Sequence, residues 1–145
     1  MNSEKTEKLF EEYPDLFKRE LLTHNFDCQD GWFVLLDELG GRIRQYGDHS
    51  SENEKLEIFQ IKQKMGALRI YTRGADRVIR KLINDTEEKS KFICELDGDP
   101  ASGLYGCAPN WYRYLCKSCA DLHDVMTIED FHRKNNGVAP VHKRA

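Results

Sequence analysis

The sequence LEIFQIKQKMGALRIYTR at residues 56–73 decides the predicted fold. Its first part, 56–62, carries apolar residues on both alternating faces, which indicates a strand that is covered on both sides. A second strand is predicted over 68–73. Gly66 lies between the two strands and can supply the positive φ that a tight reversal requires. The stretch therefore predicts a β-hairpin.

Helical patterns flank this hairpin on both sides. Apolar residues recur at three- and four-residue steps in 3–22, where Pro14 divides the pattern into two short helices. Further helices are predicted over 32–47 and over about 76–91. Two polar stretches, expected to be a link and a solvent loop, lie at 23–30 and 48–54.

The amino-acid composition of the sequence changes after residue 92. Gly and Pro are frequent in 97–109, which predicts a loop, and 111–115 alternates like a short strand. A last helix is expected to start at the second cysteine pair and to pass Val125. The sequence thus predicts an α+β fold with N-terminal helices, a small hairpin sheet and a C-terminal cysteine-rich lobe of zinc type.

The predicted organisation has three parts, which also fit one continuous domain. The helical and hairpin core takes 1–92, the cysteine-rich lobe 93–134 and a frayed tail 135–145.

Length and composition exclude several classes of protein. The chain has 145 residues, a net charge of −3 and 39% hydrophobic residues, so it is neither a polycation nor a polyanion. Its longest apolar run, 32–36, is too short for a membrane span, and the first thirty residues contain no secretory signal. We therefore expect a cytoplasmic protein in a reducing compartment, where disulfides are disfavoured.

Four of the five cysteines gather near the C-terminus and give the strongest chemical signal in the chain. The pair in CKSC at 116–119 can reach one soft cation, because thiolates spaced in this way at a turn both point to it. A strand that ends before such a pair, followed by a helix, resembles the second half of a treble-clef zinc site. The predicted ligands of a structural Zn²⁺ are Cys94, Cys107, Cys116 and Cys119.

The first half of that zinc site is less regular, and two other residues can complete it. Asp97 or His123 can supply an oxygen or a nitrogen in place of Cys107. Buried thiols without metal and a redox-active pair are the alternatives. Cys28 stands alone and is expected to be a partly buried thiol near Trp32 rather than a nucleophile.

A basic stretch crosses the hairpin and the helix after it. Seven basic residues and one acid lie between Lys62 and Lys81, a local charge of +6. Strand alternation places Arg69, Tyr71 and Arg73 on one face, which suits phosphates, stacked bases or an acidic protein surface. A solvated or internally paired face is the alternative. The predicted contact residues are Lys62, Lys64, Arg69, Tyr71, Arg73 and Arg77.

The sequence gives little support for an enzyme. His123, His132 and Asn135 follow a cysteine pair, as in HNH-type nucleases, but His123 is expected on a helix and not on the strand those enzymes need. No catalytic residue is therefore predicted.

Several segments together resemble a group of small, uncharacterised bacteriophage and prophage proteins. The segments are CQDGWF at 28–33, KQKMGALRIY at 62–71, SKFICE at 90–95, and WYRYLC at 111–116 with Cys119. In that group the second segment looks like KEKFGxLRFY and the third like CExCG, so Asp97 stands where the group usually has a cysteine. The resemblance implies a viral origin and a place in the host cytoplasm, but no mechanism.

Three hypotheses of function follow. The first is a non-enzymatic phage-type binding protein, stabilised by structural zinc, that acts on a host factor such as a defence component or on nucleic acid. The second is a sponge that sequesters a nucleotide or phosphorylated small molecule through Arg69, Tyr71 and Arg73. The third is a metal-dependent HNH-like nuclease. No oligomeric state is predicted.

Overall fold

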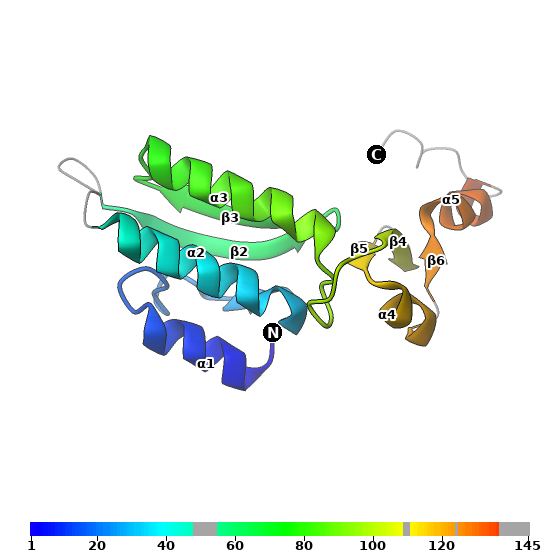
Figure 1. The fold of residues 1–145 in the computed structure, drawn as a ribbon, viewed down its shortest axis with the longest axis horizontal. Coiled ribbons are helices and arrows are strands. Elements are labelled where there is room, and N and C mark those ends of the chain that lie inside the picture. Colours follow the sequence, from blue (N-terminus) through cyan, green and yellow to red (C-terminus); the bar gives the residue numbers. More distant parts are fainter. Residues whose placement is uncertain (48–54, 109–110, 124, 137–145) are drawn as a thin grey trace.

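The computed structural model describes residues 1–47, 55–108, 111–123 and 125–136. The predicted α+β fold is confirmed. Figure 1 shows a larger part around strands β2 and β3 and a smaller part at the C-terminal end. We call residues 1–93 the N-terminal lobe and residues 94–136 the C-terminal lobe. The predicted solvent loop at 48–54 and the end of the predicted tail, 137–145, lie outside the described residues.

The N-terminal lobe begins with one helix, α1 (Ser3–Glu12), and not with the two helices predicted for 3–22. Residues 13–22 instead form turns, in which the N–H of Phe17 donates to the carbonyl of Tyr13. These turns place Phe17 and Leu22 in the core, each 1% exposed. Burial of these side chains therefore decides the local structure after Pro14.

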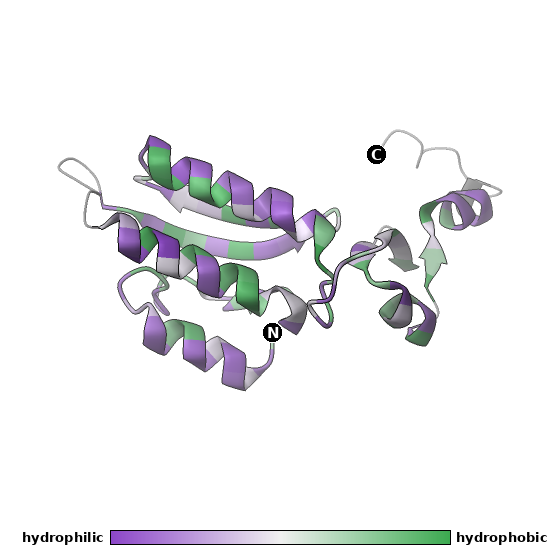
Figure 2. Cartoon of the chain, in the orientation of Figure 1, coloured by the Kyte–Doolittle hydropathy of each residue, from purple (hydrophilic) through white to green (hydrophobic). Residues whose placement is uncertain are grey.

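The two other predicted helices of this lobe are confirmed. A single 3₁₀ turn, η1 (Asp30–Trp32), leads into α2 (Phe33–Tyr46), and α3 (Arg77–Lys89) continues into η2 (Ser90–Phe92). The Asp76 carboxylate caps α3 by accepting from the N–H of Ile79 at 2.8 Å. Hydrophobic and hydrophilic residues alternate along all three helices (Figure 2), as expected of helices that each cover a core on one side.

The sheet of this lobe has the order β1-β2-β3. The short strand β1 (Phe26–Asp27), in the segment predicted as a link, runs parallel to β2 (Glu57–Lys64). The predicted hairpin is confirmed, because β3 (Ala67–Arg73) runs antiparallel to β2 after a turn with Gly66 at φ +89°. Figure 1 shows α2 and α3 beside this hairpin.

A β-bulge in β2 changes which side chains face the core. Ile58 lies opposite Thr72 and Gln60 opposite Tyr71, which leaves Phe59 as the extra residue. Ile58 and Ile61 are both buried although their odd spacing would put them on opposite faces of a regular strand. The prediction that this strand is covered on both sides is wrong, because the bulge moves both isoleucines onto one covered face.

The outer edge of β3 is closed by side chains from the end of α3 and the 3₁₀ turn after it. The backbone N–H of Leu68 donates to the hydroxyl of Ser90 at 3.0 Å, and that of Ile70 donates to the carboxylate of Glu87 at 2.8 Å. These bonds satisfy backbone N–H groups of β3 that could otherwise pair with a strand of another chain.

The C-terminal lobe contains a second sheet of order β5-β4-β6 and two helices. The predicted strand at 111–115 is confirmed as β5, whereas the loop predicted for 97–109 is wrong over β4. The glycines of β4 hide a strand, since a Cβ on Gly106 would lie 2.2 Å from the Phe131 ring. The elements of the C-terminal lobe are β4 (Gly103–Ala108), β5 (Trp111–Leu115), α4 (Lys117–Leu122), β6 (Met126–Thr127) and α5 (Ile128–Asn136).

The helix at the second cysteine pair is shorter than predicted. It starts at Lys117, as expected, but ends at Leu122 and does not reach Val125. The following residues return to pair β6 with β4 before α5 begins. Residues 135 and 136, predicted as the start of the tail, close α5. In the described part of the chain, no helix has both the length and the apolarity needed to span a membrane.

Candidate metal centre and sheet surface

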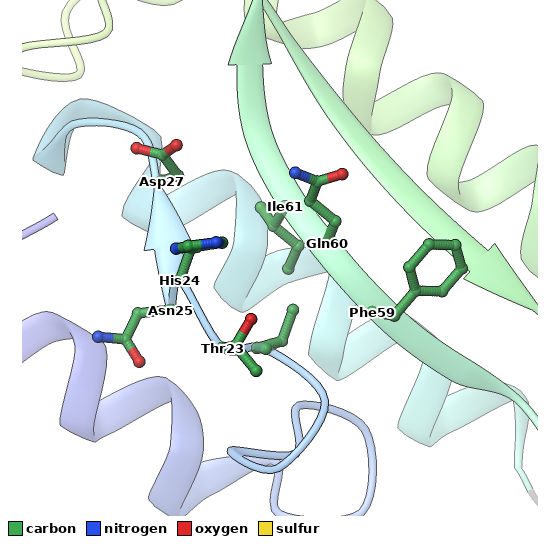
Figure 3. Close-up of a pocket in the computed structure, with 8 residues that line it drawn as sticks. Thr23, His24, Asn25, Asp27, Phe59, Gln60 and Ile61 are labelled. Atoms are coloured by element: carbon green, nitrogen blue, oxygen red, sulfur yellow. The ribbon is translucent and has the colours of Figure 1, made fainter.

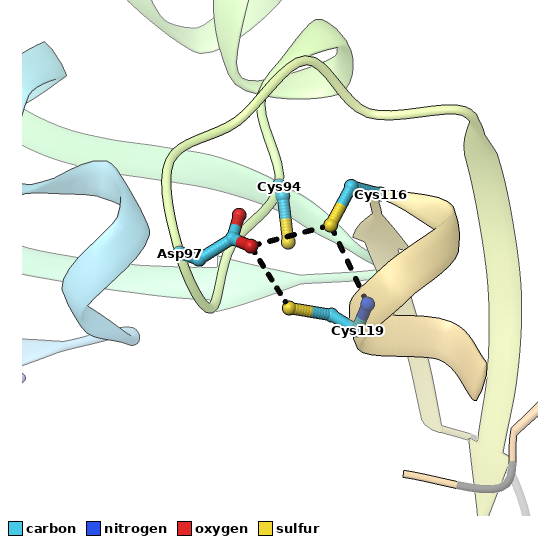
Figure 4. A group of neighbouring side chains, drawn as sticks. All are labelled: Cys94, Asp97, Cys116 and Cys119. Atoms are coloured by element: carbon cyan, nitrogen blue, oxygen red, sulfur yellow. Dashed lines mark hydrogen bonds between the residues drawn. The ribbon is translucent and has the colours of Figure 1, made fainter. Parts of the chain in front are cut away.

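Four side chains of the C-terminal lobe converge on one point (Figure 4). Their ligand atoms, three sulfurs and one carboxylate oxygen, all lie within 4.8 Å of one another. Three of the residues are buried and the acid is exposed. We call this group the cysteine–aspartate cluster; it consists of Cys94, Asp97, Cys116 and Cys119.

A tight turn after Cys94 supplies the first half of the cluster. The N–H of Gly98 donates to the carbonyl of Cys94 at 2.9 Å, and Gly98 takes a φ of +83° that a glycine adopts without strain. The N–H of Asp99 donates to one oxygen of Asp97 at 2.9 Å. Asp97 lies three residues after Cys94, and its other carboxylate oxygen is free to face the cysteines.

The second half of the cluster lies at the junction of β5 and α4. Leu115 ends β5 as a fully buried residue, and Cys116 precedes the first residue of the helix. The N–H of Cys119 donates to the sulfur of Cys116 at 3.4 Å, which places both sulfurs on the same side of the turn. The predicted order of strand, cysteine pair and helix is therefore confirmed.

Hydrogen bonds link the two halves through Asp97. The thiols of Cys116 and Cys119 donate to the same carboxylate oxygen at 3.3 and 3.2 Å. The N–H of Asp99 lowers the pKa of Asp97 to about 2, so this carboxyl is charged at neutral pH. Burial raises the pKa of the Cys116 and Cys119 thiols. A cation that replaced these two protons would meet thiolates and a carboxylate already in place.

The other two predicted ligands lie outside the cysteine–aspartate cluster. Cys107 is a half-buried residue of β4, and its nearest hydrogen-bond acceptor is the carbonyl of Tyr105 at 3.9 Å. His123 is exposed at the C-terminal end of α4. Three of the four first-choice ligands are thus brought together, and Asp97, the alternative named from the sequence, lies where Cys107 was expected.

A buried acid next to Cys94 ties the cluster to the N-terminal lobe. Glu95 is 1% exposed, and its carboxylate accepts from the side-chain amide of Gln63 at 3.1 Å and from the N–H of Gln29 at 3.2 Å. Its third partner is the guanidinium of Arg113, at 3.4 Å. Glu95 was not predicted as a functional residue, because the sequence alone does not show which glutamates are buried and which lie on the surface.

The outward face of the hairpin is the second candidate site. The predicted alternation is confirmed, because Leu68 and Ile70 are buried on the core face while Arg73 on the opposite face is exposed. We call this opposite surface the basic-aromatic face; it consists of Phe59, Lys62, Lys64, Arg69, Tyr71 and Arg73. Arg77, also predicted as a contact residue, lies instead at the start of α3.

The two rings of the basic-aromatic face lie side by side. The centroids of Phe59 and Tyr71 are 6.4 Å apart. The ammonium of Lys62 lies 5.6 Å from the Tyr71 ring, and the guanidinium of Arg73 lies 5.0 Å from the Phe59 ring. Phe59 was not among the predicted contact residues. The odd spacing of Ile58 and Ile61 on either side of it is the sequence signal that could have revealed the bulge.

The cations of this face are only partly neutralised. Arg73 forms an ion pair with Glu57 at 3.5 Å. Lys62 lies directly opposite Arg69 in the strand register, and neither forms an ion pair with an acid of the described residues. Because like charges that face each other across a ladder cost stability, the pair favours an anionic partner.

The histidines of the nuclease hypothesis do not join the cysteine–aspartate cluster. His123 directly follows α4. His132 belongs to α5, and its ring lies beside that of Phe131, with centroids 6.2 Å apart. The third residue of that hypothesis, Asn135, lies in the last turn of α5.

No protein-family model matches the chain, and no curated protein or solved structure matches it either. The resemblance to phage and prophage proteins therefore stays a prediction.

Proposed function

We propose that the protein is a non-enzymatic binding protein for single-stranded nucleic acid, with a C-terminal lobe stabilised by a zinc ion. The observation that carries the proposal is the basic-aromatic face, where two adjacent rings lie among four cations. Proteins that bind single strands combine this pair of features, since the rings stack on bases and the cations meet phosphates.

The arrangement of charges supports nucleic acid over a small phosphorylated ligand. The cations follow both strands of the hairpin over several residues, from Lys64 at the turn to Arg73 at the far end. A line of this kind matches the repeated phosphates of a strand, whereas a nucleotide sponge would need them around one enclosed pocket. A base that stacks on Tyr71 would displace Lys62 from the ring and leave its ammonium for the neighbouring phosphate.

The donor set of the cysteine–aspartate cluster supports zinc as its ion. Three sulfurs and one carboxylate oxygen make four ligands, the number that structural Zn²⁺ takes, and soft thiolates select zinc over magnesium or calcium. The ion would hold the turn at Cys94 against the start of α4, far along the chain. Its role in the proposal is structural.

Fluorescence anisotropy with a labelled eight-nucleotide single strand tests the nucleic-acid proposal. Four phosphate contacts predict a salt slope of about −3, a loss of affinity of roughly fifty-fold between 50 and 200 mM salt. Arg69→Ala should lower the slope by about 0.7. Arg42→Ala is the matched control, because Arg42 is an exposed residue of α2 and lies outside the basic-aromatic face.

Two results would overturn the proposal. One is the absence of salt-dependent binding by the folded wild-type protein. The other is an equal loss of affinity in Arg69→Ala and Arg42→Ala, since a general effect of charge would then explain the binding. Binding of an acidic host protein in the absence of any oligonucleotide binding would favour the host-factor hypothesis instead.

A further inference from the structure

A small cavity lies beside the basic-aromatic face, at the edge of the sheet (Figure 3). Its volume is about 140 Å³, too small for a whole nucleotide but enough for one planar ring. One side is formed by the segment that enters β1, including Thr23 and His24, and the other by Phe59 and Gln60 of β2. The cavity therefore opens next to the rings that the proposed function assigns to bases.

The bulge of β2 and the shortness of β1 create this cavity. β1 pairs only with Ile61 and Lys62, so it leaves the edge of β2 at Phe59 and Gln60 without a neighbouring strand. The chain before β1 turns away at Asn25, which has a φ of +55°. The bulge turns both Phe59 and Gln60 outward, and both residues line the cavity.

The polar groups around the cavity are available for a ligand. In the part of the chain that the structure describes, the side chains of Gln60 and Asp27 form no hydrogen bond or ion pair, although Gln60 is half-buried. The Gln60 amide can both donate and accept, whereas the carboxylate of Asp27 only accepts. Apolar contact comes from Leu22, Ile61 and the Phe59 ring.

We propose that this cavity binds one unpaired nucleobase that carries an exocyclic amino group beside a ring-nitrogen acceptor, as the single-ring base cytosine does. Asp27 would accept from the amino group, the Gln60 amide would donate to the ring nitrogen, and Phe59 would stack on the base. Thymine and uracil present a carbonyl to Asp27 instead, which the carboxylate repels. A phosphate is disfavoured at the same place for the same reason.

This inference rests on the proposed function, because the strand must lie on the basic-aromatic face for one base to reach the cavity. The geometry allows it, since Phe59 borders both and Lys62 lies opposite Asp27 in the register. A base in the cavity thus leaves its phosphate beside Lys62. The cavity adds base preference to a surface that otherwise binds any sequence.

The test compares three labelled eight-nucleotide strands of equal charge: oligo-dC, oligo-dT and an abasic backbone. The wild-type protein should bind oligo-dC about tenfold more tightly than oligo-dT, and the abasic strand most weakly. Asp27→Asn should bring the dC-to-dT ratio close to one, because an amide can also donate to thymine. Asp15→Asn, which changes an exposed acid of the turns after α1, is the matched control and should keep the ratio.

The salt slope separates failure of this inference from failure of the proposed function. A dC-to-dT ratio near one in the wild-type protein, with a normal salt slope, would overturn the cavity as a base site and leave the basic-aromatic face. A ratio that survives both Asp27→Asn and Gln60→Leu would also overturn it. If none of the three strands binds, the proposed function fails and the base site fails with it.

Discussion

Among the described residues, one hydrophobic cluster of the N-terminal lobe buries 18 residues, whereas the corresponding cluster of the C-terminal lobe has five, three of them cysteines. Burial of a cluster as large as that of the N-terminal lobe can offset the conformational entropy that the chain loses on folding. Five residues cannot, and small domains with so little core depend on a metal or a disulfide. The difference supports the proposal that an ion held by the cysteine–aspartate cluster replaces the missing core of the C-terminal lobe.

Removing one sulfur should have the largest effect and should separate the two lobes. In Cys116→Ser we expect loss of the bound zinc and unfolding of the C-terminal lobe, because structural zinc contributes of the order of 10 kcal/mol to folding. The helices of the N-terminal lobe should remain. Elemental analysis of the purified protein and limited proteolysis measure the two effects.

Cys107→Ser is the control for this substitution. Cys107 lies outside the cysteine–aspartate cluster, so this variant should keep its zinc and its resistance to protease. If Cys107→Ser lost the metal and Asp97→Ala kept it, the assignment of the fourth ligand would be wrong.

The buried acid between the lobes should give the next largest effect. Glu95→Ala leaves the Arg113 guanidinium without its carboxylate, and breaking a buried pair in this way costs about 3–5 kcal/mol. Urea denaturation measures the loss, with Glu88→Ala at an exposed ion pair as the control. Replacing both partners, as in Glu95→Leu with Arg113→Met, should recover part of the stability. No recovery would mean that the bonds to Gln63 and Gln29 matter more than the charge pair.

Substitutions of Asp97, the proposed fourth ligand, should have a smaller effect that tests the assignment directly. Asp97→Cys should lower the Kd for zinc by about tenfold or more, equal to at least about 1.4 kcal/mol, because a fourth thiolate is a softer ligand than a carboxylate. Asp97→Ala should raise the Kd. Competition with a chromophoric chelator measures both values. An unchanged affinity in both variants would show that Asp97 does not touch the ion.

The lone cysteine of the N-terminal lobe should give the smallest effect, visible only in alkali. Burial raises the pKa of Cys28 to about 12, so the folded protein keeps this proton while the unfolded chain loses it near the ordinary pKa of 9.0. The stability that Cys28 contributes is therefore complete below pH 9 and falls as the pH rises further. At pH 10 the loss is about 1.4 kcal/mol.

Urea unfolding of the wild-type protein and of Cys28→Ala from pH 7 to pH 10 measures this slope. The wild-type protein should lose more stability than the variant above pH 9. Parallel curves would place Cys28 in a wetter environment than its 3% exposure indicates.

Local patterns were sufficient for much of the fold. The hairpin was predicted because Gly66 separates two short apolar runs, and α3 because Asp76 precedes a regular apolar stripe. The cysteine pair at the start of α4 was predicted for the same reason, since ligand spacing at a turn is itself local. Each of these features depends on residues that are neighbours in the sequence.

The errors arose where distant residues decide the structure. The glycine-rich segment of β4 is a strand because β5 and β6 pair with it and because Phe131 packs on Gly106. The bulge at Phe59 breaks the alternation from which a strand's buried face is read, so β2 was given two covered faces. Neither the strands that pair with β4 nor the register shift that makes the bulge can be seen in the local sequence.

The sequence by itself determined that this chain is α+β, that its hairpin carries a basic face and that its last cysteines can meet one ion. Only the tertiary structure decided between Asp97 and Cys107 in the cysteine–aspartate cluster. Cys107 is held in β4 by strand pairing, whereas the turn closed by Gly98 carries Asp97 to the sulfurs. Tertiary structure also placed Phe59 and Gln60 at the edge of a cavity. Spacing along a chain fixes which ligands are near each other locally, but the last ligand and the walls of a pocket depend on packing between segments that the sequence keeps apart.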